Sequence, residues 1–370
     1  MAVTASDLVG KILKGGADSF VGVDIGSSST KIVQLSVKDG VVTLDTYGDI
    51  NNAPYAESEP GAVRRENTHG TSAGLQDLLH EVKSDARTCG VAVSLAETLF
   101  NTVELPKRDP EQMALIVPVE AKQYIPMPIE KVMLDWYAIP DPLDEGSAFD
   151  VLRSREHTVA KNQKVMIVAV KKETALVLGN IISDTSLSPE FYEIEMFSVV
   201  RSCAHDINAP VLIIDFGAMT TKVYIVNETE IAMAARLIPV GGQALTEVIR
   251  QSLSCNFEEA EKVKCESGLV MSDSAGVIKA VLSPAWTFVQ QMLEEYKKGG
   301  NKPVAKILLT GGGAYMPGIV DLVSATFSLP VEMADAFKRS RGPIILENVL
   351  KEDGPRYAIA MGLALRGIGK

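Results

Sequence analysis

Two segments with nearly the same pattern lie in opposite halves of the chain, and each contains residues that can bind phosphate and a metal ion. The first reads VDIGSSSTK over residues 23–31, and the second reads IDFGAMTTK over residues 214–222. Each has an aspartate at the end of an apolar run, a glycine two positions later, and then mostly small or hydroxyl-bearing residues. The aspartate can hold a hydrated metal ion, because hard cations prefer oxygen ligands. The glycine and the small residues permit a tight turn whose backbone amides face phosphate oxygens.

Because this pattern occurs once in each half, it predicts two similar domains that clamp a nucleotide between them. One such hairpin alone would be weak support, since Asp24 and Asp215 could instead stabilise their turns as ordinary Asx residues. Lys31 and Lys222 follow the two turns and could offset phosphate charge, although a lysine on a strand after a turn is often a solvated surface residue. The matched pair of hairpins favours the nucleotide clamp.

A third glycine-rich segment lies near the C-terminus. The apolar run at 304–309 predicts a strand, three glycines follow at 311–313, and residues 317–327 have helical spacing. Backbone without side chains lets a base or sugar approach closely, and the N-terminus of the next helix can face negative charge. Alone, the segment could equally be a plain strand-to-helix connection; together with the two hairpins it predicts a nucleotide contact.

Composition limits the class of protein. At 370 residues the chain is long enough for two or more domains, and 46% hydrophobic residues are ordinary for a globular protein. The net charge of −11 argues against nucleic acid as the main partner. The four cysteines are scattered, which fits reduced thiols in the cytosol. No apolar run is long enough to span a bilayer, and no signal peptide is expected, because the N-terminus lacks the basic and apolar regions of one. Residues 7–14 could form a short amphipathic membrane-surface helix or an ordinary chain end.

The hairpins lie within alternating strands and helices, which indicates an α/β fold. In the first half, strands are expected at 20–35 (a hairpin), 41–47, 90–95, 135–139 and 164–170, and helices at 74–88, 109–123 and 173–183. In the second half, strands are expected at 210–215, 222–227, 230–239 and 304–309, and helices at 245–253, 257–263, 277–296, 317–327 and 357–366. Residues 51–72 and 141–162 are rich in polar or turn-forming residues and are expected to be loops.

This combination resembles the actin-like ATPase superfamily and, within it, the PilM family of type IV pilus assembly, which is similar to the cell-division family FtsA. The resemblance covers residues 20–367, and its marks are the segments 21–31, 120–128, 238–246, 259–264 and 362–367. The segment EAKQYIPMP at 120–128 is the most specific, because ordinary actins and sugar kinases lack the subdomain that contains it. The resemblance implies an α/β, actin-like (ribonuclease H-like, duplicated) two-domain ATPase fold with an inserted FtsA/PilM-type subdomain.

The resemblance also implies how the chain is divided. The expected parts are an N-terminal extension (1–19), a first actin-like subdomain (20–97 and 166–208), an inserted partner-binding subdomain (98–165), a second actin-like subdomain (209–245 and 305–370) and a small helical subdomain at the nucleotide cleft (246–304).

The family further implies ATP or ADP with Mg²⁺ as ligands, and it assigns a role to each matching position. Asp24 and Asp215 would flank the metal ion, mostly through water. Glu261 and Lys264 match an element that resembles a ribose or adenine contact. Met219 and Lys222 stand where small residues or threonine are more usual. The implied nucleotide-binding residues are Gly26, Ser27, Ser28, Ser29, Thr30, Lys31, Gly217, Ala218, Met219, Thr220, Thr221, Gly241, Gly242, Glu261, Lys264, Gly311, Gly312, Gly313, Ala314 and Met316.

The implied role is a cytoplasmic ATP-binding adaptor of the type IV pilus inner-membrane platform, with a part in twitching motility. Such an adaptor binds the cytoplasmic N-terminal tail of a PilN-like membrane protein and connects it to PilB/PilT-like motor ATPases; it could also self-associate. No residue is assigned to catalysis: Glu193 and Glu195 are candidates by position only, and at most weak ATPase activity is expected. Two alternatives stay open, a filament-forming FtsA-like division protein and a small-molecule kinase. The first usually carries a C-terminal amphipathic helix, which this chain, ending at Lys370, is expected to lack.

Overall fold

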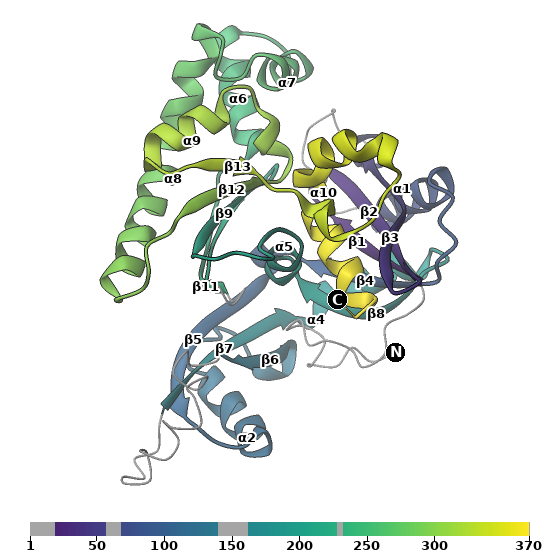
Figure 1. The fold of residues 1–370 in the computed structure, drawn as a ribbon, viewed down its shortest axis with the longest axis vertical. Helices are drawn as coiled ribbons and strands as arrows, with labels where there is room; N and C mark the ends of the chain where they lie inside the picture. Colours follow the sequence, from purple (N-terminus) through teal and green to yellow (C-terminus); the bar gives the residue numbers. More distant parts are fainter. Residues whose placement is uncertain (1–18, 57–67, 140–161, 228–231, 370) are drawn as a thin grey trace.

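The computed structural model describes residues 19–56, 68–139, 162–227 and 232–369, and its strands form three sheets (Figure 1). Within the described part of the chain, no helix is long and apolar enough to cross a membrane. Residues 7–14, read as either a short amphipathic helix or an ordinary chain end, lie outside the described residues.

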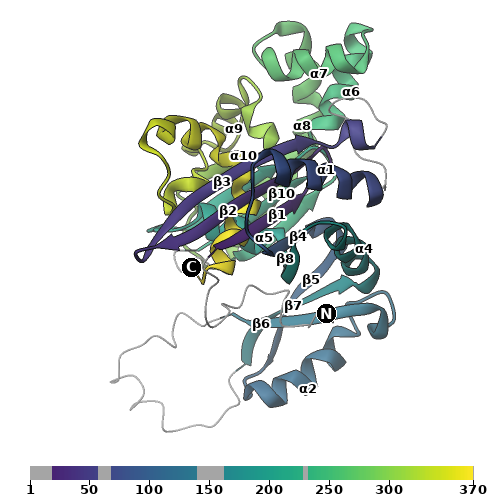
Figure 2. The same ribbon diagram turned by 90° about the vertical axis from the view of Figure 1, so that its right-hand side faces the viewer.

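The first sheet has five strands in the order β3-β2-β1-β4-β8. Its strands are β1 (Ser19–Ile25), β2 (Ser29–Lys38), β3 (Val41–Asn51), β4 (Thr88–Val93) and β8 (Ser188–Ile194). The helices that cover it are α1 (Thr68–Glu81), α4 (Lys172–Ser183), α5 (Glu195–Cys203) and α10 (Glu347–Gly367). Successive residues of a strand point to opposite faces, and on β3 the ring of Tyr47 contacts Tyr357 of α10 whereas Gly48 lies against Val82 at the end of α1. The sheet is therefore covered on both faces, by α1 on one and α10 on the other (Figures 1 and 2).

The second sheet repeats this arrangement with the order β11-β10-β9-β12-β13. Its strands are β9 (Val211–Phe216), β10 (Thr221–Val226), β11 (Ala232–Ile238), β12 (Lys306–Thr310) and β13 (Val331–Met333). The helices of this half are α6 (Gly242–Leu253), α7 (Phe257–Glu266), α8 (Ser272–Lys298) and α9 (Ile319–Phe327). In both sheets the first two strands form an antiparallel hairpin and the first strand also pairs with a parallel strand, β4 or β12. The two halves are thus built on the same plan.

A smaller sheet of three strands lies at the other end of the molecule, with the order β5-β7-β6 (Figure 1). It consists of β5 (Thr98–Pro106), β6 (Val132–Ala138) and β7 (Asn162–Lys171), with α2 (Pro110–Ala121) packed against it around a core of its own. Asp109 caps α2 by accepting a hydrogen bond from the backbone N–H of Gln112 at 2.8 Å. β7 pairs with β5 and β6 as far as Lys171. The three-stranded sheet therefore extends past residue 165, where the inserted subdomain was expected to end.

The last helix differs most from the prediction. It was expected at 357–366 but spans Glu347–Gly367 and continues through Pro355. Although it was assigned to the second actin-like subdomain, it packs mainly on the first sheet and on α5. Proline interrupts a helix because it lacks an N–H and crowds the preceding turn. Here the Pro355 carbonyl accepts hydrogen bonds from Thr310 Oγ1 at 2.6 Å and from the Gly311 N–H at 2.9 Å, which tie the helix to the glycine-rich segment.

Other differences concern element boundaries. α1 begins at Thr68, inside the expected loop, and in its first turn the Ser72 hydroxyl donates to the Thr68 carbonyl. β5, β8, α5 and the short β13 were not predicted. Short 3₁₀ turns occur at Ala53–Tyr55, Leu95–Glu97, Ile129–Lys131, Gly312–Tyr315, Ala336–Arg339 and Ile344–Leu346.

Candidate nucleotide-binding site

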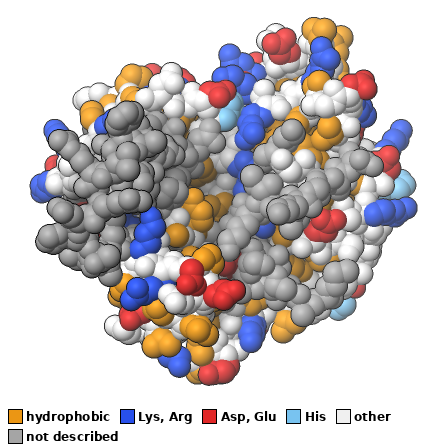
Figure 3. Space-filling view, turned by 60° about the horizontal axis from the view of Figure 1, so that its bottom comes forward, with side chains coloured by type: hydrophobic (Ala, Val, Ile, Leu, Met, Phe, Trp, Pro, Cys, Tyr) orange, Lys and Arg blue, Asp and Glu red, His pale blue; other side chains and the backbone are white. Residues whose placement is uncertain are grey.

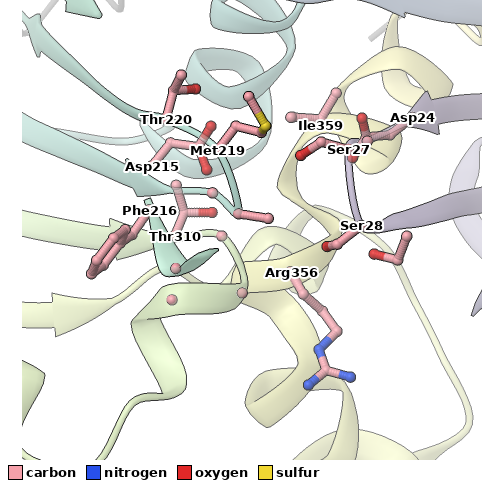
Figure 4. A pocket seen from close by; sticks show the side chains of 18 of the residues that line it. Asp24, Ser27, Ser28, Asp215, Phe216, Met219, Thr220, Thr310, Arg356 and Ile359 are labelled. Carbon is pink, nitrogen blue, oxygen red and sulfur yellow. The ribbon is translucent and has the colours of Figure 1, made fainter. Parts of the chain in front are cut away.

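The two hairpins have the same register and the same turn. Asp24 pairs with Lys31 across the first hairpin, and Asp215 pairs with Lys222 across the second. The Gly26 N–H donates to the Ser29 carbonyl at 3.1 Å, and the Gly217 N–H donates to the Thr220 carbonyl at 3.0 Å. The side chains labelled in Figure 4 show the hairpins facing each other, with Asp24, Ser27 and Ser28 on one side and Asp215, Met219 and Thr220 on the other.

A cavity of about 930 Å³ lies between the two hairpins and is lined by residues of both halves. Its size suits a nucleotide, since small-molecule sites commonly measure about 300–1,000 Å³. The predicted residues that line it are Asp24, Gly26, Ser27, Ser28, Ser29, Lys31, Asp215, Gly217, Ala218, Met219, Thr220, Lys222, Gly242, Glu261, Lys264, Gly311, Gly312, Gly313 and Met316.

Four predicted residues do not line the cavity and instead support its walls. The buried Thr30 hydroxyl donates to Asn52 Oδ1 at 2.9 Å, and the Thr221 hydroxyl donates to the Val240 carbonyl at 2.7 Å. Ala314 is buried in the core of the second half. Gly241 lies so close to the backbone of Ala218 that a Cβ would overlap it. These residues hold the loops in place without reaching a ligand.

The two aspartates supply buried carboxylate oxygens on opposite sides of the cavity. Asp24 is 8% exposed and Asp215 is 4% exposed. Burial raises the pKa of Asp24 to about 6; Glu195 and Asp215 add to this rise, whereas Lys31 and Lys222 oppose it. Buried negative charge of this kind favours the arrival of a cation.

This donor set fits Mg²⁺. The ion usually takes one or two carboxylates and completes its shell with water and phosphate oxygens. Among the described residues, no group of three or more His, Cys, Asp or Glu could enclose a metal ion. A magnesium ion here would therefore need Asp24, Asp215 and oxygens from a ligand and water.

The lysines that follow the hairpins have different partners. Lys31 Nζ donates to Ser29 Oγ at 2.6 Å, inside its own turn. Lys222 Nζ is buried and donates to Glu195 Oε2 at 3.0 Å, with Asp215 Oδ2 at 3.4 Å. These carboxylates hold the pKa of Lys222 well above its ordinary value in spite of its burial. Lys31 can face a phosphate, whereas Lys222 joins the two halves.

The first turn of α6 joins the second hairpin to α7. The Gly242 N–H donates to the Gly217 carbonyl at 2.9 Å, and the Gln243 N–H donates to the Ala218 carbonyl at 2.8 Å. From α7, Lys264 Nζ donates to Glu261 Oε2 at 2.6 Å and reaches the Gly242 carbonyl at 3.3 Å. The predicted Glu261–Lys264 pair therefore lies at the cavity wall and is fixed against the second phosphate-loop candidate.

The glycine-rich segment after β12 lies directly against Asp215, the aspartate of the second hairpin. Gly311 has a φ of +83°, and a Cβ there would overlap Asp215 Oδ1 and the Phe216 carbonyl oxygen. Gly312 has open space where its Cβ would be. A side chain is thus excluded at Gly311 for steric reasons, whereas Gly312, which lines the cavity, has room for one.

Arg356 and Tyr315 are among the cavity-lining residues that the sequence analysis missed. Arg356 of α10 lines the cavity, and its guanidinium lies over the Tyr315 ring with 4.8 Å between Cζ and the ring centroid. Tyr315 also lines the cavity. The only sequence signal was the position of Tyr315 next to the glycines; nothing local to Arg356 indicated a helix that returns to the site.

Two similar α/β halves with a nucleotide-sized cavity between matched hairpins define the actin-like class of two-domain proteins. A family model described as type IV pilus assembly protein PilM matches residues 22–368. The chain belongs to this PilM family, as the resemblance in the sequence indicated.

Solved structures show the same fold. A chain of the PilM-PilN type IV pilus biogenesis complex superposes with a TM-score of 0.79 at 23% identity, covering 94% of this chain and 98% of that one. The ethanolamine utilization protein EutJ from Carboxydothermus hydrogenoformans gives a TM-score of 0.54 at 16% identity, covering 98% and 93%. The predicted actin-like fold is confirmed.

The chain is also similar to cell-division proteins. FtsA from Pseudomonas aeruginosa is 22% identical over 400 residues, covering 95% of this chain and 89% of FtsA. FtsA from Bacillus subtilis is 22% identical over 391 residues, covering 93% and 82%.

Proposed function

We propose that the protein is a cytoplasmic, ATP-binding adaptor of the type IV pilus inner-membrane assembly platform. It binds the cytoplasmic N-terminal tail of a PilN-like membrane protein and connects it to PilB/PilT-like motor ATPases. Membership in the PilM family supports the pilus role, and the likeness to a chain of the PilM-PilN type IV pilus biogenesis complex supports the partner. The protein reaches the inner membrane through this partner.

The observation that carries the nucleotide part is the pair of hairpins in equivalent register around one cavity. Backbone amides of the two turns would face phosphates, and Asp24 and Asp215 would hold Mg²⁺ through water. Magnesium bound with ATP would supply positive charge at the phosphates. The protein's own groups, above all Lys31 and the two turns, would orient the nucleotide. ATP would then favour whichever arrangement of the two halves binds it more tightly.

We place the partner tail at the junction between the first sheet and the three-stranded sheet. At this junction α4 follows β7 directly, and Lys171 Nζ lies 3.6 Å from Glu97 Oε2 just before β5. Exposed apolar side chains of these elements are Leu99 at 37%, Leu176 at 68% and Val177 at 41%. Figure 3, which brings this end of the molecule forward, shows hydrophobic side chains at the surface beside lysine and arginine. An extended peptide gains affinity from such apolar contacts together with backbone pairing.

A labelled peptide with the sequence of the host's PilN-like tail tests the adaptor role. We expect the full chain to bind it with micromolar affinity, and Leu176→Glu to weaken binding by at least ~10-fold, because a charge would enter an apolar contact. Val270→Glu is the matched control, since Val270 is 77% exposed but lies in the second half. Absence of binding to the folded wild type at high micromolar peptide would refute the adaptor role.

Calorimetry with Mg²⁺ and ATP tests the nucleotide site. Asp24→Ala and Asp215→Ala should each weaken binding, and unchanged affinity in both variants would refute the clamp. The likeness to FtsA supports a second candidate function, filament formation. Sedimentation with ATP distinguishes the two, because a filament-forming protein would pellet without the peptide.

A further inference from the structure

The lysines of the two hairpins occupy equivalent positions but do not act alike. Lys31 bonds to Ser29 within its own turn, whereas Lys222 reaches Glu195, the first residue of α5 in the other half. The second hairpin is therefore tied to the first half by a buried ion pair that the first hairpin lacks.

Both carboxylate oxygens of Glu195 are occupied. Oε1 accepts hydrogen bonds from the Leu95 N–H at 2.7 Å and from Ser94 Oγ at 3.2 Å, and Oε2 accepts one from Lys222 Nζ at 3.0 Å. The Glu195 side chain is only 5% exposed although the residue lines the cavity. Its two oxygens are thus held by three donors, and Oε2, the oxygen with a single donor, is bound to the Lys222 ammonium.

Glu195 is nevertheless the carboxylate best placed beside the two aspartates. It lies close enough to Asp24 to contribute to the rise of its pKa, and it shares the Lys222 ammonium with Asp215. Other carboxylates that line the cavity have partners away from this point. Asp49 accepts from Tyr357, Glu261 from Thr246 and Lys264, and Glu97 from Thr174.

We propose that Lys222 is a positioning residue that restrains Glu195, so that the protein holds ATP and hydrolyses it slowly. The inference rests on the proposed nucleotide function. In hydrolysis a water oxygen bonds to the γ-phosphorus, the bond from that phosphorus to the β–γ bridging oxygen breaks, and a proton of the water passes to a carboxylate. ADP and phosphate then leave. A general base must have an oxygen within hydrogen-bond reach of the water, and the Lys222–Glu195 pair withholds that oxygen.

The same pair joins the two halves at the floor of the cavity. While it is intact, the second hairpin stays fixed to α5, and a bound nucleotide stabilises this closed arrangement. The nucleotide then serves as a structural ligand of the adaptor and is not consumed in each cycle.

The test uses the full chain with Mg²⁺ and radiolabelled ATP. Nucleotide binding, thermal unfolding and single-turnover phosphate release are measured for wild type, Lys222→Met, the double variant Lys222→Met/Glu195→Gln, and Lys306→Met. The last is a matched control, because Lys306 forms an exposed pair with Glu332 at 2.7 Å outside the cavity. We expect Lys222→Met to release phosphate about 100-fold faster than wild type, the contribution typical of a general base. The double variant should be slow again, and Lys306→Met should match wild type.

Several results would overturn the proposal. One is a folded, ATP-binding Lys222→Met that is no faster than wild type, and another is a double variant as fast as Lys222→Met. Should Lys222→Met fail to fold, wild type alone decides: bound ATP must be recovered largely intact, and turnover near the ~1 s⁻¹ of ordinary enzymes contradicts the restraint. Absence of ATP binding by wild type refutes the nucleotide part of the proposed function, whereas binding with rapid hydrolysis refutes the restraint alone.

Discussion

Glu193 and Glu195 are separated by one residue at the end of β8, yet their carboxylates lie in different environments. Glu193 is fully buried away from the cavity, and its Oε1 accepts from Arg201 at 2.7 Å and from Arg366 at 3.3 Å. Glu195 lines the cavity and pairs with Lys222. Their positions in the sequence made both candidates for catalysis. The structure separates them: Glu193 holds α5 and α10 together, and only Glu195 faces the site.

Glu193→Gln should therefore destabilise the fold. Burial alone would raise the pKa of Glu193, but Arg201 and Arg366 lower it overall, so its charge is compensated in the folded state. Removing that charge takes this carboxylate away from the part-buried Arg201 and the buried Arg366, and we expect a loss of about 3–5 kcal/mol. Urea denaturation measures the change. Asp45→Asn, which breaks the exposed pair with Lys38, is the control and should cost no more than ~1 kcal/mol.

Asp24→Asn should stabilise the protein without nucleotide and weaken its binding of Mg²⁺ and ATP. The folded-state pKa of about 6 lies above the ordinary 3.8, so ionising the buried Asp24 costs up to about 3 kcal/mol at pH 7. The neutral amide avoids this cost but is a poorer magnesium ligand. Thermal unfolding and calorimetry measure the two effects. If Asp24→Asn instead lowers both the stability of the nucleotide-free protein and its binding of Mg²⁺ and ATP, the role of Asp24 is purely structural.

Nucleotide affinity should fall as the pH is lowered from 7 to 5. Asp24 takes up a proton as the pH falls through about 6, and a protonated carboxyl no longer attracts the metal ion. The contribution of Asp24 to the stability of the nucleotide-free protein depends on pH in the opposite direction, rising as the pH falls. Because the pKa is raised in the folded state, this stability is greatest at low pH and is lost as the pH rises from about 4 to about 6. Titrations of wild type and Asp24→Asn at several pH values separate this effect from protonation of ATP itself, which both proteins experience.

Local patterns carried enough information for most of the fold. The strands on both sides of Gly26 and Gly217 are apolar runs ending at an aspartate, and the structure has hairpins at both places. β5 was missed because its only buried residues are Thr98, Val103 and Leu105, so its sequence has no continuous apolar run. The full length of α10 was missed because Pro355 is a helix breaker by local rules.

Contacts between distant segments explain what was missed at the site. The Pro355 carbonyl bonds to Thr310 and Gly311, residues far away in the sequence, so tertiary packing overrides the local preference. The Lys222–Glu195 pair likewise depends on how the two halves meet. A hairpin sequence predicts where a lysine stands but not which carboxylate it will find across an interface between domains.

Gly311→Ala and Gly312→Ala should separate the structural from the binding role of the glycine-rich segment. Gly311 has a positive φ, and a methyl group there would strike Asp215 Oδ1 and the Phe216 backbone, so we expect a loss of stability of at least ~1–3 kcal/mol. At Gly312 a methyl group meets nothing within 4 Å, so stability should change by less than ~1 kcal/mol. Because Gly312 lines the cavity, a methyl group there should weaken ATP binding instead. Unfolding and calorimetry on both variants measure this contrast, and a Gly312→Ala that binds ATP as wild type does would show that the nucleotide lies elsewhere in the cavity.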